Sequence, residues 1–202
     1  MAIALALAMW IDHRVGEPSA AFHPVVWMGK YLQACGRVTV GCAPAPAFLL
    51  GALAWCAGAV TVGAVAWGLQ ALSFSSLAGW TMQPALTRIV VGVLLLLLLA
   101  WMLKTMLSWR MLRDEVAAVE SSLQQSLQAG RQRLAMLVSR DTATLSESEV
   151  RESAIESLAE NLNDSVVAPV FWFVLFGLPG AAVYRFANTA DAMWGYRGLR
   201  DG

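Results

Sequence analysis

The stretch from Ser139 to Asp164, SRDTATLSESEVRESAIESLAENLND, is the most polar segment of an apolar chain, and a long apolar run follows it at once. Ser146 with Glu149 three residues later is a capping box, which predicts that a helix begins there. We expect the helix to end between Asn161 and Asp164. One apolar stripe is predicted along it by residues spaced three and four apart: Ile155, Leu158, Ala159, Leu162 and Val166. Carboxylates and amides are thus expected at a membrane boundary.

The composition is that of a membrane protein. Of 202 residues, 58% are hydrophobic and 14% are charged, whereas soluble domains carry about 25% charged residues. The net charge is zero, so nothing indicates the basic face of a nucleic-acid binder. Cys35, Cys42 and Cys56 form no CxxC pair and are interpreted as unpaired. The N-terminus lacks leading basic residues and a cleavage motif, so we expect it to be retained.

Two transmembrane helices are predicted, over 47–72 and 85–103, because both segments are long and almost uncharged. The loop 73–84 between them has no lysine or arginine, whereas Lys104, Arg110 and Arg113 follow the second helix. By the positive-inside rule, 104–165 and 12–46 lie in the cytoplasm and 73–84 lies outside.

The segments around these two helices are less regular in sequence. Residues 1–11 are apolar but too short to span, so they enter the bilayer in part or pack against other helices. Residues 12–46, rich in proline, are expected to form an irregular segment at the membrane surface. Within 104–165, Gly130 is expected to end a first helix and 131–138 to form a second. An amphipathic stripe marks the first helix: Trp109, Leu112, Val116, Val119 and Leu123.

The third apolar stretch, 166–187, allows two arrangements. It is either a kinked full span or a re-entrant hairpin that turns at Gly177-Leu178-Pro179-Gly180. The first half, 166–176, would rise only about 16 Å as a helix, half a bilayer. Overall we expect an all-α polytopic membrane protein, a single membrane domain with cytoplasmic amphipathic helices and a polar C-terminal motif over 188–202.

The polar residues suit phosphate and magnesium chemistry better than nucleophilic catalysis. The chain has no P-loop, G-x-S-x-G or H-E-x-x-H pattern. It offers acids, amides and arginines that could bind Mg²⁺ through oxygen and neutralise phosphate. These are Asp12, Glu17, Arg140, Asp141, Glu160, Asn161, Asp164, Asn188, Asp191 and Arg197. Glu149, Glu152 and Glu156 are interpreted as a solvated face, and His23 by its spacing as a structural hydrogen-bonding residue.

Several motifs resemble the adenosylcobinamide-phosphate synthase family of cobalamin biosynthesis (CbiB/CobD). They are Asp12-x-x-x-Gly16-Glu17-Pro18, His23-Pro24-Val25-x-Trp27-x-Gly29, Arg140-Asp141-Thr142, Glu160-Asn161-x-x-Asp164, Ala168-Pro169 and Asn188-Thr189-x-Asp191-x-Met193-x-Gly195-Tyr196. Members of that family continue well beyond the last motif, so the chain resembles the N-terminal two-thirds of such a protein.

The resemblance implies an ATP-dependent ligase that joins adenosylcobyric acid, a corrinoid, to aminopropanol or its O-phosphate. It implies a multi-pass protein of the cytoplasmic (inner) membrane, embedded in the lipid bilayer, whose site faces the cytoplasm. Other membrane proteins of the corrinoid pathway are conceivable partners.

Roles for individual residues are hypotheses built on that resemblance. Arg140, Asp141, Glu160 and Asp164 are the candidate catalytic residues, and Asp164, Glu160 and Asp191 the candidate ligands of Mg²⁺ on ATP. Arg140 would stabilise the transferred phosphoryl group, which Asp141 would orient. Substrate or nucleotide binding is assigned to Asp12, Glu17, His23, Thr142, Asn161, Asn188, Asp191, Tyr196 and Arg197.

Two other classes of function remain open from the sequence. A non-catalytic membrane sensor or regulatory protein on a related fold needs no convergence of these side chains. A transporter needs acidic residues at the bilayer midplane and a second, matching broken helix, and the sequence offers no such second helix.

The lysine and arginine asymmetry predicts the topology. After replacement of the native cysteines, a membrane-impermeant maleimide added to intact cells should label a cysteine at position 76 and miss one at position 122. Both should react after permeabilisation. Labelling of position 122 alone in intact cells would invert the topology.

Overall fold

A computed structural model describes residues 1–79 and 84–195, with side chains given outside 75–79. The helices are α1 (Ala2–Val15), α2 (Pro24–Thr39), α3 (Pro44–Gly79), α4 (Ala85–Lys104), α5 (Trp109–Gln125), α6 (Leu127–Leu134), α7 (Glu147–Leu162) and α8 (Ala168–Trp194). A 3₁₀ turn, η1 (Ala20–Phe22), precedes α2, and a π-helical turn, η2 (Asn163–Val167), joins α7 to α8. No strand occurs in the described ranges, which confirms the all-α prediction.

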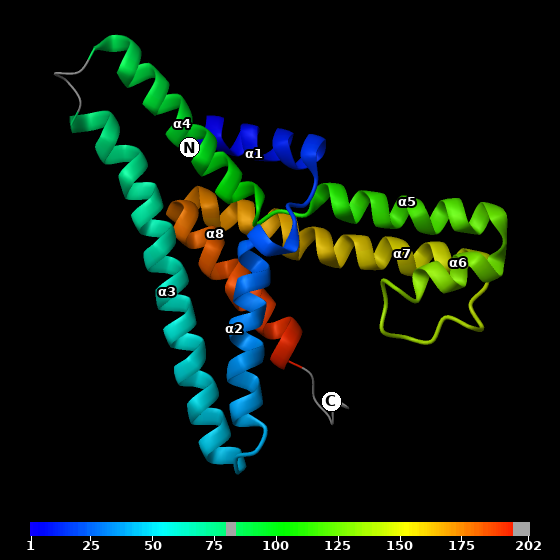
Figure 1. The fold of residues 1–202 in the computed structure, drawn as a ribbon. Coiled ribbons are helices and arrows are strands. Elements are labelled where there is room, and N and C mark those ends of the chain that lie inside the picture. Colours follow the sequence, from blue (N-terminus) through cyan, green and yellow to red (C-terminus); the bar gives the residue numbers. More distant parts are fainter. Residues whose placement is uncertain (80–83, 196–202) are drawn as a thin grey trace.

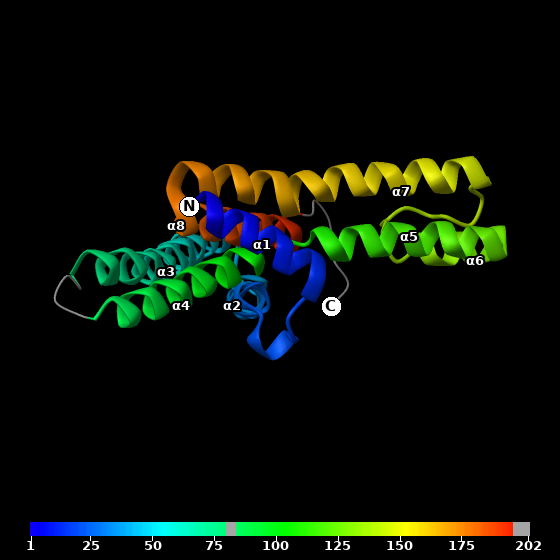
Figure 2. The ribbon, with the colours of Figure 1, turned by 90° about the horizontal axis from the view of Figure 1, so that it is seen from above.

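The molecule consists of a body and a projecting arm. Helices α1, α2, α3, α4 and α8 pack into the body, and α5, α6 and α7 extend sideways from it in both views (Figures 1 and 2). Three helical stretches are long and apolar enough to cross a membrane: Pro44–Phe74, Ala85–Lys104 and Glu147–Trp194. A helix of sufficient length and apolarity is thus present at each of the two predicted spans, although α3 begins earlier and continues to Gly79, through the first part of the predicted loop 73–84.

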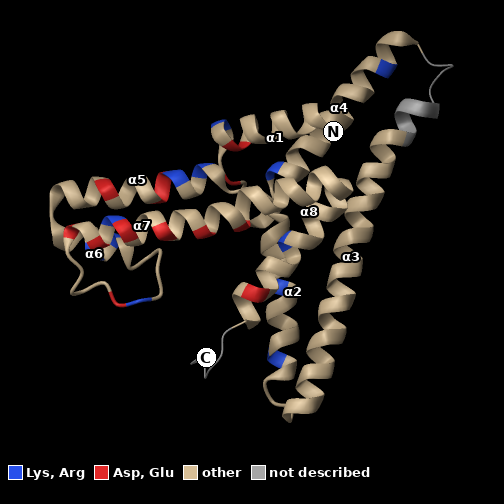
Figure 3. Ribbon diagram, turned by 180° about the vertical axis from the view of Figure 1, so that it is seen from behind, with Lys and Arg blue, Asp and Glu red and all other residues tan. Residues whose placement is uncertain are grey.

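The distribution of charge matches this division. Lysine, arginine, aspartate and glutamate gather on the arm and where the arm meets the body, whereas α3 carries none in its printed sequence (Figure 3). Each part has its own apolar core. The body core includes Leu103, Phe173 and Phe186, and the arm core is built from Val119, Leu123, Leu134, Val150 and Ala154.

The N-terminal segment is more regular than predicted. Helix α1 packs against α4, with Ala4 and Ala8 fully buried, so the alternative of packing against other helices holds for 1–11. The expectation of an irregular segment over 12–46 is wrong, because α2 occupies much of it and packs on α3 and α8. Pro24 and Pro44 each stand at the first position of a helix, where the missing N–H costs nothing.

The arm differs from the prediction at its first turn. The predicted stripe of α5 is confirmed at Val119 and Leu123, which are buried. The break, however, comes at Ser126, whose side chain accepts from the Ala129 N–H and caps α6. Gly130 lies inside α6 and does not end a helix. A Cβ at this position would come within 2.3 Å of the Leu123 side chain, so glycine is needed there. It serves close packing of α5 on α6.

Helix α7 begins as predicted but buries a different face. The capping box of Ser146 and Glu149 is present. The predicted stripe fails at Ile155, which is 62% exposed, and holds at Val166, which is buried. The buried residues are Val150, Ser153 and Ala154, one helical turn apart. The small side chains of this narrow face allow α7 to lie close to α5.

Helix α7 ends at Leu162, within the predicted range of Asn161 to Asp164, but the chain remains helical beyond it. It continues through the π-helical turn η2 into α8 without leaving helical geometry. A π turn adds one residue and is frequent at functional sites. Here it precedes Pro169, which lacks an N–H, and it changes the direction in which Asp164 and Ser165 point.

Helix α8 reverses direction at Gly177, whose φ of 70° and ψ of −157° are not helical. The segments of α8 before and after Gly177 then pack side by side in opposite directions. A Cβ at Gly180 would lie 2.4 Å from the Trp172 carbonyl oxygen, and Asn188 donates to the Asp164 carboxylate. This geometry is that of the hairpin alternative for 166–187, and it differs from a single kinked span.

A side chain of α3 completes the reversal. The Leu178 N–H donates to Gln70 Oε1 at 2.7 Å. In a membrane interior, a backbone N–H without a partner costs several kcal/mol. The Gln70 amide therefore stabilises the turn, and it also fills the space beside Gly177, where a Cβ would lie 2.2 Å from Oε1.

Gly177→Ala should destabilise the protein by about 1–3 kcal/mol, because alanine is strained at positive φ and clashes with Gln70. Thermal unfolding in detergent measures the loss. Gly68→Ala, a site on α3 with nothing within 4 Å of the added Cβ, is the matched control and should leave the midpoint unchanged. Equal midpoints for both variants would contradict the account of the reversal.

Candidate functional site

A pocket of about 520 Å³ opens where the arm meets the body. Its walls come from the α6–α7 connection, α7, η2 and the end of α8. The lining residues are Leu137, Val138, Ser139, Arg140, Glu156, Ser157, Glu160, Asn161, Asp164, Ser165, Asn188, Asp191, Ala192 and Gly195. Three sequence motifs that are distant along the chain thus share one cavity.

The pocket brings together six of the predicted site residues: Arg140, Glu160, Asn161, Asp164, Asn188 and Asp191. The Asp164 carboxylate is held from two sides. Its Oδ2 accepts from Asn188 Nδ2 and its Oδ1 accepts from Asn163 Nδ2, both at 3.1 Å. The hairpin at Gly177 creates the first contact, because it returns the chain to η2.

Glu156 also lines the pocket, where it forms an ion pair with Arg140. The side chain of Glu156 is exposed, which agrees with its interpretation as part of a solvated face, but the sequence did not predict its pairing with Arg140. Glu149 is occupied by the cap of α7, and Glu152 is exposed and does not line the pocket. Arg140 is the cation among the lining residues, which otherwise carry carboxylates, amides and hydroxyls.

Asp141 and Thr142 do not line the pocket. Asp141 Oδ1 accepts from the Ala143 N–H at 2.9 Å, a local turn contact. Thr142 is buried and donates to the Arg131 carbonyl at 3.0 Å. Their placement gives them a structural role in the α6–α7 connection, and the catalytic and binding roles assigned to them stay predictions.

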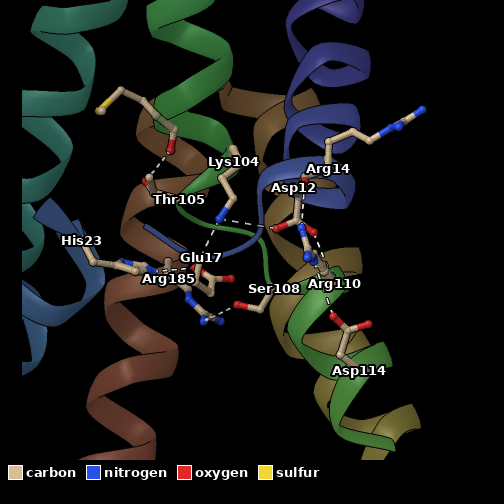
Figure 4. Close-up of polar contacts among 11 residues, drawn as sticks. Asp12, Arg14, Glu17, His23, Lys104, Thr105, Ser108, Arg110, Asp114 and Arg185 are labelled. Carbon is tan, nitrogen blue, oxygen red and sulfur yellow. Dashed lines mark hydrogen bonds and ion pairs between the residues drawn. The ribbon is translucent and has the colours of Figure 1, made fainter. Parts of the chain in front are cut away.

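Asp12, Glu17 and His23 lie in a second, buried polar cluster around Lys104 (Figure 4). Lys104 Nζ is 3.6 Å from Asp12 Oδ1 and 3.3 Å from Glu17 Oε2, and the side chains of Lys104 and Asp12 are fully buried. Gly16, at φ 76°, makes the turn between the two carboxylates. None of these three residues lines the pocket, and their binding roles stay predictions.

His23 has both ring nitrogens in use. Its Nδ1 accepts from the Val25 N–H at 3.3 Å, so Nε2 carries the proton and donates to Glu17 Oε2 at 2.8 Å. Burial opposes ionisation of Glu17. The hydrogen bond from His23 and the charge of Lys104 outweigh it, however, and hold the pKa of Glu17 below its ordinary value. The prediction of a structural His23 agrees with this geometry.

Asp12 also caps a helix that begins nearly a hundred residues later. Its Oδ2 accepts from the Arg110 N–H at 3.0 Å, in the first turn of α5. Ser108, at the N-cap position, makes no such side-chain bond. A carboxylate at a helix N-terminus satisfies an unpaired N–H and opposes the positive end of the helix dipole.

Arg185 lies between the cluster and the pocket. Its Nη1 donates to Ser165 Oγ at 2.9 Å and contacts Asn188 Oδ1 at 3.5 Å, and its Nη2 contacts Ser108 Oγ at 3.4 Å. The sequence analysis assigned neither Lys104 nor Arg185 to the site. The available signal was an ionisable residue in or beside an apolar run, which is rare unless functional or paired.

Comparison with known proteins agrees with this arrangement of motifs. The model of a protein family described as CobD/CbiB protein matches residues 5–201. The chain belongs to the CobD/CbiB family. No solved structure matches it.

The relatives carry names from cobalamin biosynthesis. A "Probable cobalamin biosynthesis protein CobD" of Pyrococcus furiosus is 38% identical over 197 residues, which are 98% of this chain and 62% of the relative. A "Cobalamin biosynthesis protein CobD" of Chromobacterium violaceum is 37% identical over 207 residues, covering 98% of this chain and 59% of the relative. The chain thus spans less than two-thirds of the length of these CobD relatives.

The carboxylates predicted to hold magnesium share the pocket without forming a preformed metal cage. Within residues 1–79 and 84–195, no three His, Cys, Asp or Glu side chains are grouped closely enough to hold a metal ion. The predicted set Glu160, Asp164 and Asp191 therefore fits a metal only with further ligands from a substrate. Tyr196 and Arg197, also predicted in this CobD/CbiB chain, lie outside the described residues.

Lys104→Met should destabilise the protein by about 3–5 kcal/mol, because it leaves two carboxylates without their buried cation. Unfolding in detergent measures the change. Lys30→Met, at an exposed position of α2, is the control and should have little effect. Adding Asp12→Asn to Lys104→Met should recover part of the loss. Equal stability of the two single variants would show that the buried cluster contributes nothing.

Proposed function

We propose that the protein works in cobalamin biosynthesis as the ATP-dependent amide ligase that joins adenosylcobyric acid to aminopropanol or its O-phosphate. Membership of the CobD/CbiB family and the names of the relatives support a role in that pathway. The specific reaction is our inference from the resemblance of the motifs and from the pocket.

The observation that carries the proposal is the convergence at the pocket. Glu160 and Asp164 precede the hairpin, Asn188 and Asp191 follow it, and all four line one cavity. A ligase must hold a nucleotide, an acid and an amine together, since positioning supplies much of its rate enhancement. Convergence of this kind is not needed in a sensor, so it favours an enzyme over that alternative.

Amide formation from a carboxylate requires activation of the acid, for which an acyl phosphate is the usual device. Asp164 and Asp191 are the residues that would hold a nucleotide's magnesium. This ion typically takes one or two protein carboxylates together with phosphate oxygens and water. When bound, magnesium would neutralise charge on the phosphates. The hydroxyls and amides of Ser165 and Asn161 would donate to substrate oxygens.

Arg140 and Glu160 complete the proposed chemistry. Arg140 is paired with Glu156 at an exposed position, so a phosphate that enters the pocket can compete for its guanidinium. Glu160 is exposed and lines the pocket together with Asp164, which supports a role as acceptor of the proton from the attacking amine. Arg140 and Glu160 both line the pocket, whereas Asp141 does not and has no role in the proposed mechanism.

The proposal includes the orientation in the membrane. The arm is charged, and lysine and arginine flank the end of α4 (Figure 3). These features favour a cytoplasmic arm and a pocket that opens to the cytoplasm in a multi-pass protein of the inner membrane. Cytoplasmic ATP and corrinoid would then reach it directly.

The reaction can be tested with the complete gene product in detergent or nanodiscs. It should convert adenosylcobyric acid into an amide only when ATP, magnesium and one of the two amines are present. Mass spectrometry of the corrinoid identifies both the product and the amine used. Formation of no amide with either amine would refute the ligase assignment.

Asp164→Asn should lower turnover at least about 100-fold. The substitution removes the negative charge that would bind magnesium and stabilise the positive charge that develops on the attacking amine. The near-identical shape should preserve the fold. Glu152→Gln, an exposed residue of α7 outside the pocket, serves as the matched control with normal turnover. Normal turnover of Asp164→Asn would remove Asp164 from the catalytic residues.

A further inference from the structure

Arg185 is a charged residue of the third apolar stretch to which no role in the reaction has been given. It lies on the part of α8 that follows Gly177, where its guanidinium contacts Ser108, Ser165 and Asn188. Among the described residues, none of its nitrogens lies within ion-pair distance of a carboxylate, and its buried Nε has no partner. Its hydrogen bonds therefore go to neutral groups, whereas the nearby carboxylates of Glu17 and Asp164 act on it only through their charge.

The chemistry of the guanidinium fixes the orientation of Asn188. Arginine can only donate hydrogen bonds, so Asn188 presents its carbonyl oxygen, Oδ1, to Arg185. The amide nitrogen then faces Asp164 and donates to Oδ2. A flipped amide would set donors against donors at Arg185 and oxygen against oxygen at Asp164. One orientation therefore satisfies both neighbours.

The same chain of contacts fixes the Asp164 carboxylate. With Asn188 on Oδ2 and Asn163 on Oδ1, both oxygens have a donor. Asp164, Asn188 and Ser165 line the pocket, whereas Arg185 lies behind its wall. Nη1 donates to Ser165 as well, so two pocket residues are held by one guanidinium nitrogen.

We propose that Arg185 is a positioning residue for the pocket, which orients Asp164 through Asn188 and holds the Ser165 hydroxyl. The value of this role for catalysis rests on the proposed function, but the positioning itself does not. Its third contact, with Ser108, leads away from the pocket toward the Lys104 cluster (Figure 4). Removal of the Ser108 hydroxyl therefore serves as a control, because it deletes a contact of Arg185 that does not involve a pocket residue.

The positioning can be measured without activity. A water-soluble carbodiimide with glycine ethyl ester converts reactive carboxylates to amides, which mass spectrometry quantifies residue by residue. In Arg185→Lys, which keeps the charge but loses the planar fork, Asp164 should be modified roughly fivefold faster, the factor expected for one lost hydrogen bond. Asn188→Ala should give the same increase. Ser108→Ala should leave Asp164 as in the wild type, and Asp191 is the internal reference.

Two results of this measurement would overturn the inference. One is an unchanged rate at Asp164 in Arg185→Lys or, if that variant does not fold, in Asn188→Ala. The other is an equal increase in Ser108→Ala, which would indicate general loosening around Arg185. An increase confined to Arg185→Lys and Asn188→Ala supports it.

Turnover of the complete gene product adds the functional test. Arg185→Lys should lower kcat by about 10–100-fold, the range for residues that orient a ligand carboxylate, with an unchanged KM for the corrinoid. Because both residues act along one path, the double variant with Asn188→Ala should be no slower than the slower single variant. If the wild type forms no amide, the ligase proposal fails and the carbodiimide result still decides the positioning. A wild-type kcat in Arg185→Lys would overturn the catalytic role of the positioning alone.

Discussion

The hydrogen bond from the Leu178 N–H to Gln70 is the interaction on which the arrangement of the site depends. A helix that reverses in an apolar environment exposes backbone groups, and a neighbouring side chain must satisfy them. Gln70 does so from α3, a helix that carries no charge along its sequence. The reversal at Gly177 then returns Asn188 to Asp164 and closes the pocket.

The junction of arm and body is held by polar contacts between segments that are far apart in sequence. Asp12 caps α5, Lys104 joins Asp12 to Glu17, and the Ser108 N–H donates to the Ser165 carbonyl. Polar contacts are directional, so they define a geometry more sharply than apolar packing does. The pocket is built directly on this junction, which suits a site that must hold several groups in register.

The sequence predicts those features of the fold that have a local cause. The spans follow from apolar length, the start of α7 from its capping box, and the turn at Gly177 from glycine and proline. The stripe through Ile155 failed because periodicity does not tell whether an apolar face meets protein or another apolar medium. The partners of Lys104 and the pairing of Glu156 with Arg140 could not be predicted. The contacts of Lys104 span 87 residues or more and leave no local pattern. The motifs identified most of the pocket, but they also included Asp141, which supports a loop.

The buried pair of Asp12 and Lys104 has a consequence for the order in which the protein folds. Asp12 leaves the ribosome early, yet its partners Lys104 and the Arg110 N–H exist only after the end of α4 and the first turn of α5 have been made. Pairing of such distant segments is slow because a long loop must close. Helix α1 therefore reaches its native contacts only after the chain as far as α5 has been made, and the burial of Asp12 couples the start of the chain to the junction of arm and body.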